Sequence, residues 1–265
     1  MNFYNISYLN LFNKECKRKD VSNLADLAVQ YGIENATTEK WKEIVQEKNE
    51  ITRKKLIDDL VLKLEKNKEI NGFFGKDDVV KIDSVNGFKI DDKELYYLFF
   101  ETLKEGFNQT KKLGYDIVYH AVRNTLVKYF GKPVANSKAL RLELTNPNSG
   151  SDDFMYLSIS QQRGKGTGVC VEQASVAHNL WLLSGVKSYY ISTKDMQTDL
   201  ALDNNGHSFC VVEYNGSFKL FDSSLELFMK LDFDPIELMR KGLPFEVEID
   251  GKKTTYTNAG RFLTL

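Results

Sequence analysis

The spacing of apolar positions predicts helices in the first part of the chain. Within residues 37–72, Leu56, Leu60 and Leu64 follow one another at intervals of four. Threonines suited to N-capping precede this pattern, and an Asn-Gly pair ends it. We therefore expect a helical segment here, within a mostly helical N-terminal region that covers residues 1–110.

Two further elements are expected in the same region. The stretch KIDSVNGFKI contains an Asn-Gly pair at 86–87, which predicts a short hairpin. The segment after it has Asp91 and Glu94 at the spacing of a capping box, so a helix is expected to begin there. None of these segments carries a catalytic motif. Packing, or the docking of a partner through these helices, is the role that their pattern favours.

Beyond residue 110 the pattern changes to one helix followed by antiparallel hairpins. An amphipathic helix is predicted from Tyr115, and the segment FMYLSIS (154–160) alternates like a strand. Two later segments turn at an Asn-Gly pair (215–216) and an Asp-Gly pair (250–251), with the short helix DPIELMRKG between them. A helix that precedes hairpins, instead of alternating with strands, indicates an α+β domain over residues 111–265.

The composition is that of an ordinary soluble globular protein. Charges nearly balance, with 36 basic and 37 acidic residues, so there is no electrostatic basis for binding nucleic acid or an anionic membrane. No apolar run is long enough to span a bilayer. A secretory signal places basic residues before its apolar run, whereas here the first basic cluster comes after the apolar residues. Three cysteines in 265 residues do not form a disulfide framework. We expect a cytoplasmic protein, although signal-independent export would leave the same pattern.

Cys170 lies between the glycine-rich stretch GKGTG and a long apolar segment. That segment is apolar on most sides, which predicts a buried central helix ending at Ser184 and Gly185. Cys170 then occupies the first turn, where free N–H groups and the helix dipole favour a thiolate, the nucleophilic form. The preceding glycines let the backbone approach a ligand closely. A buried, unreactive cysteine is the competing interpretation.

Three histidines could act as a base for this thiol. His178 lies on the same helix, about 12 Å of axial rise from Cys170, which is too far for a hydrogen bond. His120 lies beside the apolar face of its helix, where a structural role is favoured. His207 begins a strand directly after the polar stretch LDNNG, at a sheet margin where loops and ligands meet. His207 is therefore the candidate base.

The turn at 215–216 relates His207 to Asp222. If two residues form the turn, Phe209 opposes Asp222 across the hairpin. His207 and Asp222 then share a face as diagonal neighbours, with Cβ atoms roughly 7 Å apart. A carboxylate at this place holds one imidazole nitrogen and leaves the other for the thiolate. A turn of odd length would put Asp222 on the opposite face.

An oxyanion hole would use the N–H of Cys170 and a second donor, for which Gln161 and Gln162 are the candidates. A phosphate-binding loop is disfavoured because GKGTG lacks the GK[ST] ending that such loops require. The sequence predicts neither a metal site nor a cofactor.

The segments GVCVEQASVAHNLWLLSGV, SYYIS and GHSFCVVEYNGSFKLFDSS resemble the transglutaminase-like superfamily of papain-type thiol enzymes. The resemblance implies a papain/transglutaminase-like core, in which a central helix packs on an antiparallel sheet. It also implies Cys170 as nucleophile, His207 as general base and acid, and Asp222 as the orienting acid. It extends at most over residues 115–225 and does not explain the first 110 residues.

The chain departs from the superfamily in two respects. Many members carry an aromatic residue, often tryptophan, well upstream of the cysteine to help stabilise the oxyanion. The tryptophans of this chain are Trp41 and Trp181, and Tyr156 is a candidate replacement. No cluster of acids suited to calcium is present in the sequence, which argues against metal-regulated cross-linking.

These observations predict an acyl-transfer enzyme that acts on amide bonds of proteins or peptides through a thioester on Cys170. Water is the expected second substrate, which would make the protein a peptidase or a glutamine deamidase, with transglutaminase activity as a variant. An arylamine N-acetyltransferase-like protein would share the order of the triad and the C-x-E pattern of Cys170 and Glu172. Such proteins follow the aspartate with a glycine-aromatic run, where this chain has DSSLELF. A non-catalytic binding protein would have no chemical reason to retain Cys, His and Asp together.

Overall fold

The computed structural model describes residues 40–70, 90, 92–131, 159–193, 195–198, 207–214, 216–240 and 243–257. The helices in these ranges are α3 (Lys40–Gln46), α4 (Glu50–Ile70), α6 (Lys93–Thr110), α7 (Tyr115–Phe130), α9 (Cys170–Leu183) and α10 (Pro235–Arg240), with the short 3₁₀ helix η3 (Ser160–Gln162). The strands are β1 (Lys187–Thr193), β2 (Asp195–Thr198), β3 (His207–Tyr214), β4 (Ser217–Asp222), β5 (Leu227–Leu231), β6 (Phe245–Ile249) and β7 (Lys252–Thr257). The fold is α+β, as the sequence predicts.

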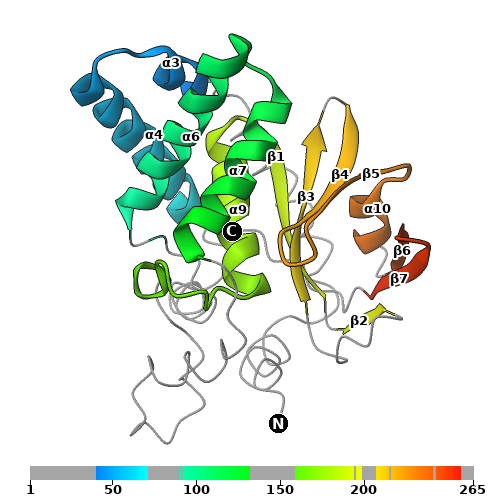
Figure 1. Ribbon diagram of the computed structural model, residues 1–265. Helices are drawn as coiled ribbons and strands as arrows, with labels where there is room; N and C mark the ends of the chain where they lie inside the picture. Colours follow the sequence, from blue (N-terminus) through cyan, green and yellow to red (C-terminus); the bar gives the residue numbers. More distant parts are fainter. Residues whose placement is uncertain are drawn as a thin grey trace, which may run out of the picture.

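The strands form two antiparallel sheets, one in the order β1-β3-β4-β5 and the other in the order β2-β7-β6. Helix α9 packs on β1 and β3, and α7 packs on α9 (Figure 1). Alternate residues of β3 therefore enter two cores. Cys210 and Val212 pack with the helices, whereas Phe209 and Val211 pack with α10 and the second sheet.

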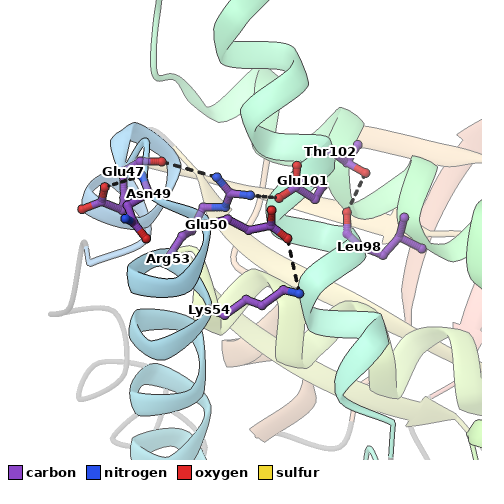
Figure 2. Close-up of polar contacts among 8 residues, drawn as sticks. All are labelled: Glu47, Asn49, Glu50, Arg53, Lys54, Leu98, Glu101 and Thr102. Atoms are coloured by element: carbon purple, nitrogen blue, oxygen red, sulfur yellow. Dashed lines mark hydrogen bonds and ion pairs between the residues drawn. The ribbon is translucent and has the colours of Figure 1, made fainter.

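The segment expected as helical within residues 37–72 is broken into α3 and α4. Asn49 ends the break, because its Oδ1 accepts a hydrogen bond from the Thr52 N–H at 3.1 Å. The Asn49 N–H in turn donates to Glu47 Oε1 at 2.7 Å, and both side chains are visible in Figure 2. The side-chain oxygen of an asparagine can cap the start of a helix, so a new helix begins after Asn49. The regular leucine spacing lies entirely within this second helix, α4.

Arg53 joins the N-terminal helices to one another. Its side chain is buried on α4, forms an ion pair with Glu101 of α6 and donates to the Glu47 carbonyl at 3.4 Å (Figure 2). The apolar residues of α3, α4 and α6 belong to the same hydrophobic core as those of α7 and α9. The predicted boundary between an N-terminal region and a C-terminal domain, after residue 110, lies in the connection between α6 and α7. That these two parts are separate domains stays a prediction.

The start of α6 differs by one residue from the expected start. Its N-cap is Asp92, whose side chain accepts from the Glu94 N–H at 3.0 Å. The hairpin expected around 86–87 lies outside the described residues. Of the strand expected at 154–160, only Ile159 and Ser160 are described. Ile159 is the N-cap of η3 and Ser160 its first residue, so the strand prediction is wrong there.

The two hairpins predicted at 215–216 and 250–251 are confirmed. Tyr214 pairs with Ser217, which leaves two residues in the β3–β4 turn, and the register continues to Cys210 opposite Phe221. The β6–β7 turn at 250–251 has positive φ at both positions, as a two-residue turn of type I′ requires. Within the described ranges, every helix falls short of the length and apolar character that crossing a bilayer requires.

Candidate active site

The β3–β4 hairpin brings His207 and Asp222 together on one face, as predicted from the two-residue turn. His207 is the first residue of β3 and Asp222 the last of β4. His207 Nε2 lies 2.5 Å from Asp222 Oδ2, and the carboxylate is almost completely buried. The period of two along each strand therefore places the acid against the imidazole.

The turn after β4 orients the carboxylate of Asp222. Its Oδ1 accepts hydrogen bonds from the Ser224 N–H at 3.1 Å, from Ser224 Oγ at 2.7 Å and from the Leu225 N–H at 3.3 Å. Oδ2 is then directed at His207. Ser224 was not among the predicted site residues, although an aspartate at a turn readily accepts from the backbone N–H two residues on, in an Asx turn.

Cys170 also interacts with the imidazole of His207. It is the first residue of α9, its side chain is partly exposed, and it forms a side-chain hydrogen bond with His207. Asp222 engages the Nε2 atom of the same ring. The structure thus joins Cys170, His207 and Asp222 in one hydrogen-bonded chain.

The environment of His207 favours its charged form. Burial of the ring is the largest single effect and lowers its pKa, but the hydrogen bonds and negative charges of Asp222 and Cys170 act in the opposite direction. Together these partners raise the pKa of His207 from 6.5 to about 10. The imidazole of His207 is therefore protonated at neutral pH.

Aromatic rings from both sheets pack against the imidazole. The His207 ring centroid lies 6.1 Å from that of Phe209 and 6.4 Å from that of Tyr256, which is on β7. The Tyr256 hydroxyl is buried and has no hydrogen-bond partner among the described residues. Burial and the charge of Asp222 raise the pKa of Tyr256, so the phenol stays protonated. No sequence motif pointed to Tyr256, because only the packing of the second sheet brings it to this site.

Glu172 anchors the chain that leads into Cys170. Its Oε2 accepts from the Val169 N–H at 3.2 Å, and its Oε1 accepts from Gln162 Nε2 at 3.5 Å. Val169 is the N-cap of α9 and offers no side-chain acceptor, so only half of a capping box is present. Gln162 is completely buried, while the side chain of Gln161 is exposed. An oxyanion role for either glutamine stays a prediction.

The glycines before Cys170 are accounted for by backbone conformation and packing. Gly164 and Gly166 have φ values of 72° and 66°, which side chains disfavour. A Cβ on Gly168 would lie 2.6 Å from Cδ1 of Phe130. The close approach inferred from the sequence is therefore made by the chain itself, at the end of α7.

The other two histidines take no part in this chain of hydrogen bonds. His178 is buried, with Nδ1 3.0 Å from Ser188 Oγ, which agrees with a structural role. His120 is exposed on α7, with its ring 5.0 Å from that of Tyr119, and its structural role stays a prediction. Tyr156 lies outside the described residues. Among the residues that are described, no cluster of His, Cys, Asp or Glu is suited to a metal ion.

No family model, curated protein or solved structure matches the chain. The likeness to the transglutaminase-like superfamily therefore depends on the sequence segments quoted above.

Proposed function

We propose that this protein is a thiol-dependent acyl-transfer enzyme acting on amide bonds of proteins or peptides. The observation that carries the proposal is the hydrogen-bonded chain from Cys170 through His207 to Asp222, at the partly exposed start of a buried helix. The packing of α9 on β1 and β3 supports a papain/transglutaminase-like core as part of the same proposal.

The roles of the three residues follow from their order. The Cys170 thiolate attacks the amide carbonyl carbon, and the oxyanion forms near the first N–H groups of α9. The protonated His207 donates its proton to the departing amine as the C–N bond breaks, which leaves a thioester on the sulfur. Asp222 holds the imidazole in place and stabilises its charge.

Water is the proposed acceptor of the acyl group. His207, now neutral, takes a proton from the water molecule as its oxygen attacks the thioester carbon. The carboxylic acid leaves, the thiolate is restored, and the proton stays on the imidazole. A backbone amide would give peptide hydrolysis and a glutamine side chain would give deamidation. A lysine amine in place of water would give transamidation.

Alkylation of Cys170 tests the thiol chemistry without knowledge of the substrate. Iodoacetamide near neutral pH should label Cys170 stoichiometrically and about tenfold or more faster than glutathione thiol, because the thiolate is the reacting form. His207→Ala should remove this advantage. His120→Ala is the matched control and should retain it, since His120 is exposed and outside the site. Wild-type Cys170 reacting no faster than glutathione would count decisively against the proposal.

Product analysis identifies the reaction. Incubation with denatured casein should release either ammonia, which indicates attack on glutamine, or new amino termini, which indicate proteolysis. Cys170→Ala should abolish whichever product the wild-type protein forms. Product formation that persists in Cys170→Ala would show that another group performs the chemistry.

A further inference from the structure

The loop that leads into Cys170 is hydrogen-bonded to the end of α7. The Gly164 N–H donates to the Tyr129 carbonyl at 2.7 Å, and the Gly166 N–H donates to the Phe130 carbonyl at 2.6 Å. Carbonyls in the last turn of a helix have no partner within it. The loop therefore caps the C-terminal end of α7, and these hydrogen bonds fix the position of the loop relative to α7.

The loop packs so closely on the end of α7 that there is no space for an added side chain at Gly131 or Gly168. A Cβ on Gly131, where φ is 82°, would lie 3.2 Å from the carbonyl carbon of Gly164. A Cβ on Gly168 would collide with the Phe130 ring at 2.6 Å. Phe130 is itself buried, so its ring cannot turn into solvent to make room. The backbone two residues before Cys170 thus rests directly on the Phe130 ring.

Asp92 extends this attachment to α6. Its Oδ1 caps α6 through the Glu94 N–H, while its Oδ2 accepts from the Tyr129 hydroxyl at 2.6 Å. Arg163 of the loop lies with Nη1 3.7 Å from the same Oδ2. The arginine is more than half exposed, so this ion pair contributes less than the Tyr129 bond. One carboxylate therefore links the start of α6, the end of α7 and the loop.

The far end of the loop is attached to α9. Glu172 accepts from Val169 and from Gln162, and Gln173 Nε2 donates to the Gly168 carbonyl at 2.9 Å. Cys170 thus follows a loop that is held on both sides. Its distance from His207, which is on a different element, is set by these attachments.

We propose that Asp92, Tyr129 and Phe130 are positioning residues that place Cys170 against His207. The three residues are called the α7 clamp below. The inference rests on the proposed function, because it concerns the same thiol and imidazole. It gives the helices before Tyr115 a part in the chemistry, which the resemblance to thiol enzymes does not provide.

Two matched tyrosine variants test the clamp. Tyr129→Phe removes the phenol–carboxylate bond to Asp92, and Tyr97→Phe removes a comparable bond to Asp58, at 3.1 Å, between α6 and α4. We expect Tyr129→Phe to slow alkylation of Cys170 near neutral pH by about tenfold, the effect of losing a hydrogen bond to a charged group. Tyr97→Phe should stay within about twofold of the wild-type rate. A Tyr129→Phe protein that reacts at the wild-type rate would overturn the inference.

A compensating pair tests the packing half of the clamp. Gly168→Ala should slow alkylation of Cys170 because the new methyl group pushes the loop away from Phe130, and adding Phe130→Ala should restore the rate at least in part. Gly114→Ala is the control, since a Cβ there meets nothing within 4 Å. A Gly168→Ala protein as reactive as wild type would refute the packing role, as would a double variant slower than Gly168→Ala alone. Circular dichroism of each variant shows whether the fold is retained.

Titration of His207 by NMR separates failure of the clamp from failure of the proposed function. Contact with Cys170 contributes to the raised pKa of His207, so displacement of the loop in Tyr129→Phe should lower that pKa. If wild-type Cys170 is unreactive but Tyr129→Phe still lowers the His207 pKa, the proposed function fails and the clamp stands. If Cys170 is reactive and both measurements are unchanged in Tyr129→Phe, the clamp fails alone.

Discussion

Asp222 presents its two oxygens to different parts of the molecule, and only Oδ2 meets His207 Nε2, at 2.5 Å. The three donors on Oδ1 all come from the turn that follows β4, so the carboxylate cannot rotate without losing them. A hydrogen bond from an imidazolium to a buried carboxylate is among the stronger polar interactions in a protein. The direction of the imidazole is therefore determined by the β4–β5 turn.

Asp222→Asn should lower the pKa of His207. Asparagine keeps the size and one oxygen of the aspartate but removes the charge, and burial of the ring then prevails. In an NMR titration of the histidine ring protons, the wild-type His207 should titrate at about 10 and the variant well below that value. Asp116→Asn, which alters an exposed acid bonded to Tyr214, should leave the titration unchanged. An unaltered His207 pKa in Asp222→Asn would contradict the assigned role of the carboxylate.

The contribution of His207 to folding stability should depend on pH. Its pKa is raised in the folded protein above the ordinary value of 6.5, so the folded state holds a proton that the unfolded state releases. The stabilisation is complete below pH 6.5 and is lost as the pH rises through about 10. Urea unfolding of wild type and His207→Gln should show a difference in unfolding free energy that shrinks over this interval. A difference that is constant with pH would contradict the raised pKa.

Tyr256→Phe should stabilise the fold. The buried hydroxyl has no partner among the described residues, and an unsatisfied buried polar group costs roughly 1–3 kcal/mol. Removing it should raise the unfolding free energy in urea titrations by about 1 kcal/mol. Tyr214→Phe provides the comparison and should not stabilise, because the Tyr214 hydroxyl donates to Asp116 at 3.3 Å. A loss of stability in Tyr256→Phe would show that its hydroxyl is hydrogen-bonded in solution.

Cys210 should be inert in the folded protein. It is completely buried on β3, its Sγ donates to the Ala174 carbonyl at 3.2 Å, and burial raises its pKa. Peptide mapping after brief iodoacetamide treatment should find Cys170 modified and Cys210 unmodified, with Cys210 labelled only in denaturant. Cys210→Ala should lower the unfolding free energy by about 1 kcal/mol and leave Cys170 reactivity intact. Rapid labelling of Cys210 in the native protein would contradict its buried environment.

The parts of the fold that the sequence predicted are those with local signals. The Asn-Gly and Asp-Gly turns determine hairpin register within a few residues, which is why the shared face of His207 and Asp222 could be derived. Strand β5 was not predicted, because apolar and polar residues do not alternate along the run LFMKL. Its conformation is set by pairing with β4, as in the pair of Leu220 and Met229, and pairing is a tertiary effect.

The same distinction applies to the candidate site. Cys170 and His207 begin elements whose starts the sequence indicates, so both could be named in advance. Asp92 and Tyr129 lie 37 positions apart and meet only because α6 packs on α7. The acid expected to cap α6 was placed one residue early, since adjacent aspartates are equally good caps and packing decides between them.

The contact of Gly168 with Phe130 also constrains how relatives of this protein can diverge. A lineage that enlarges residue 168 must shrink residue 130 first or at the same time, because a larger residue 168 beside Phe130 displaces the loop before Cys170. Aligned homologues that keep Cys170 should therefore show these two positions inherited as a pair, one of them always small.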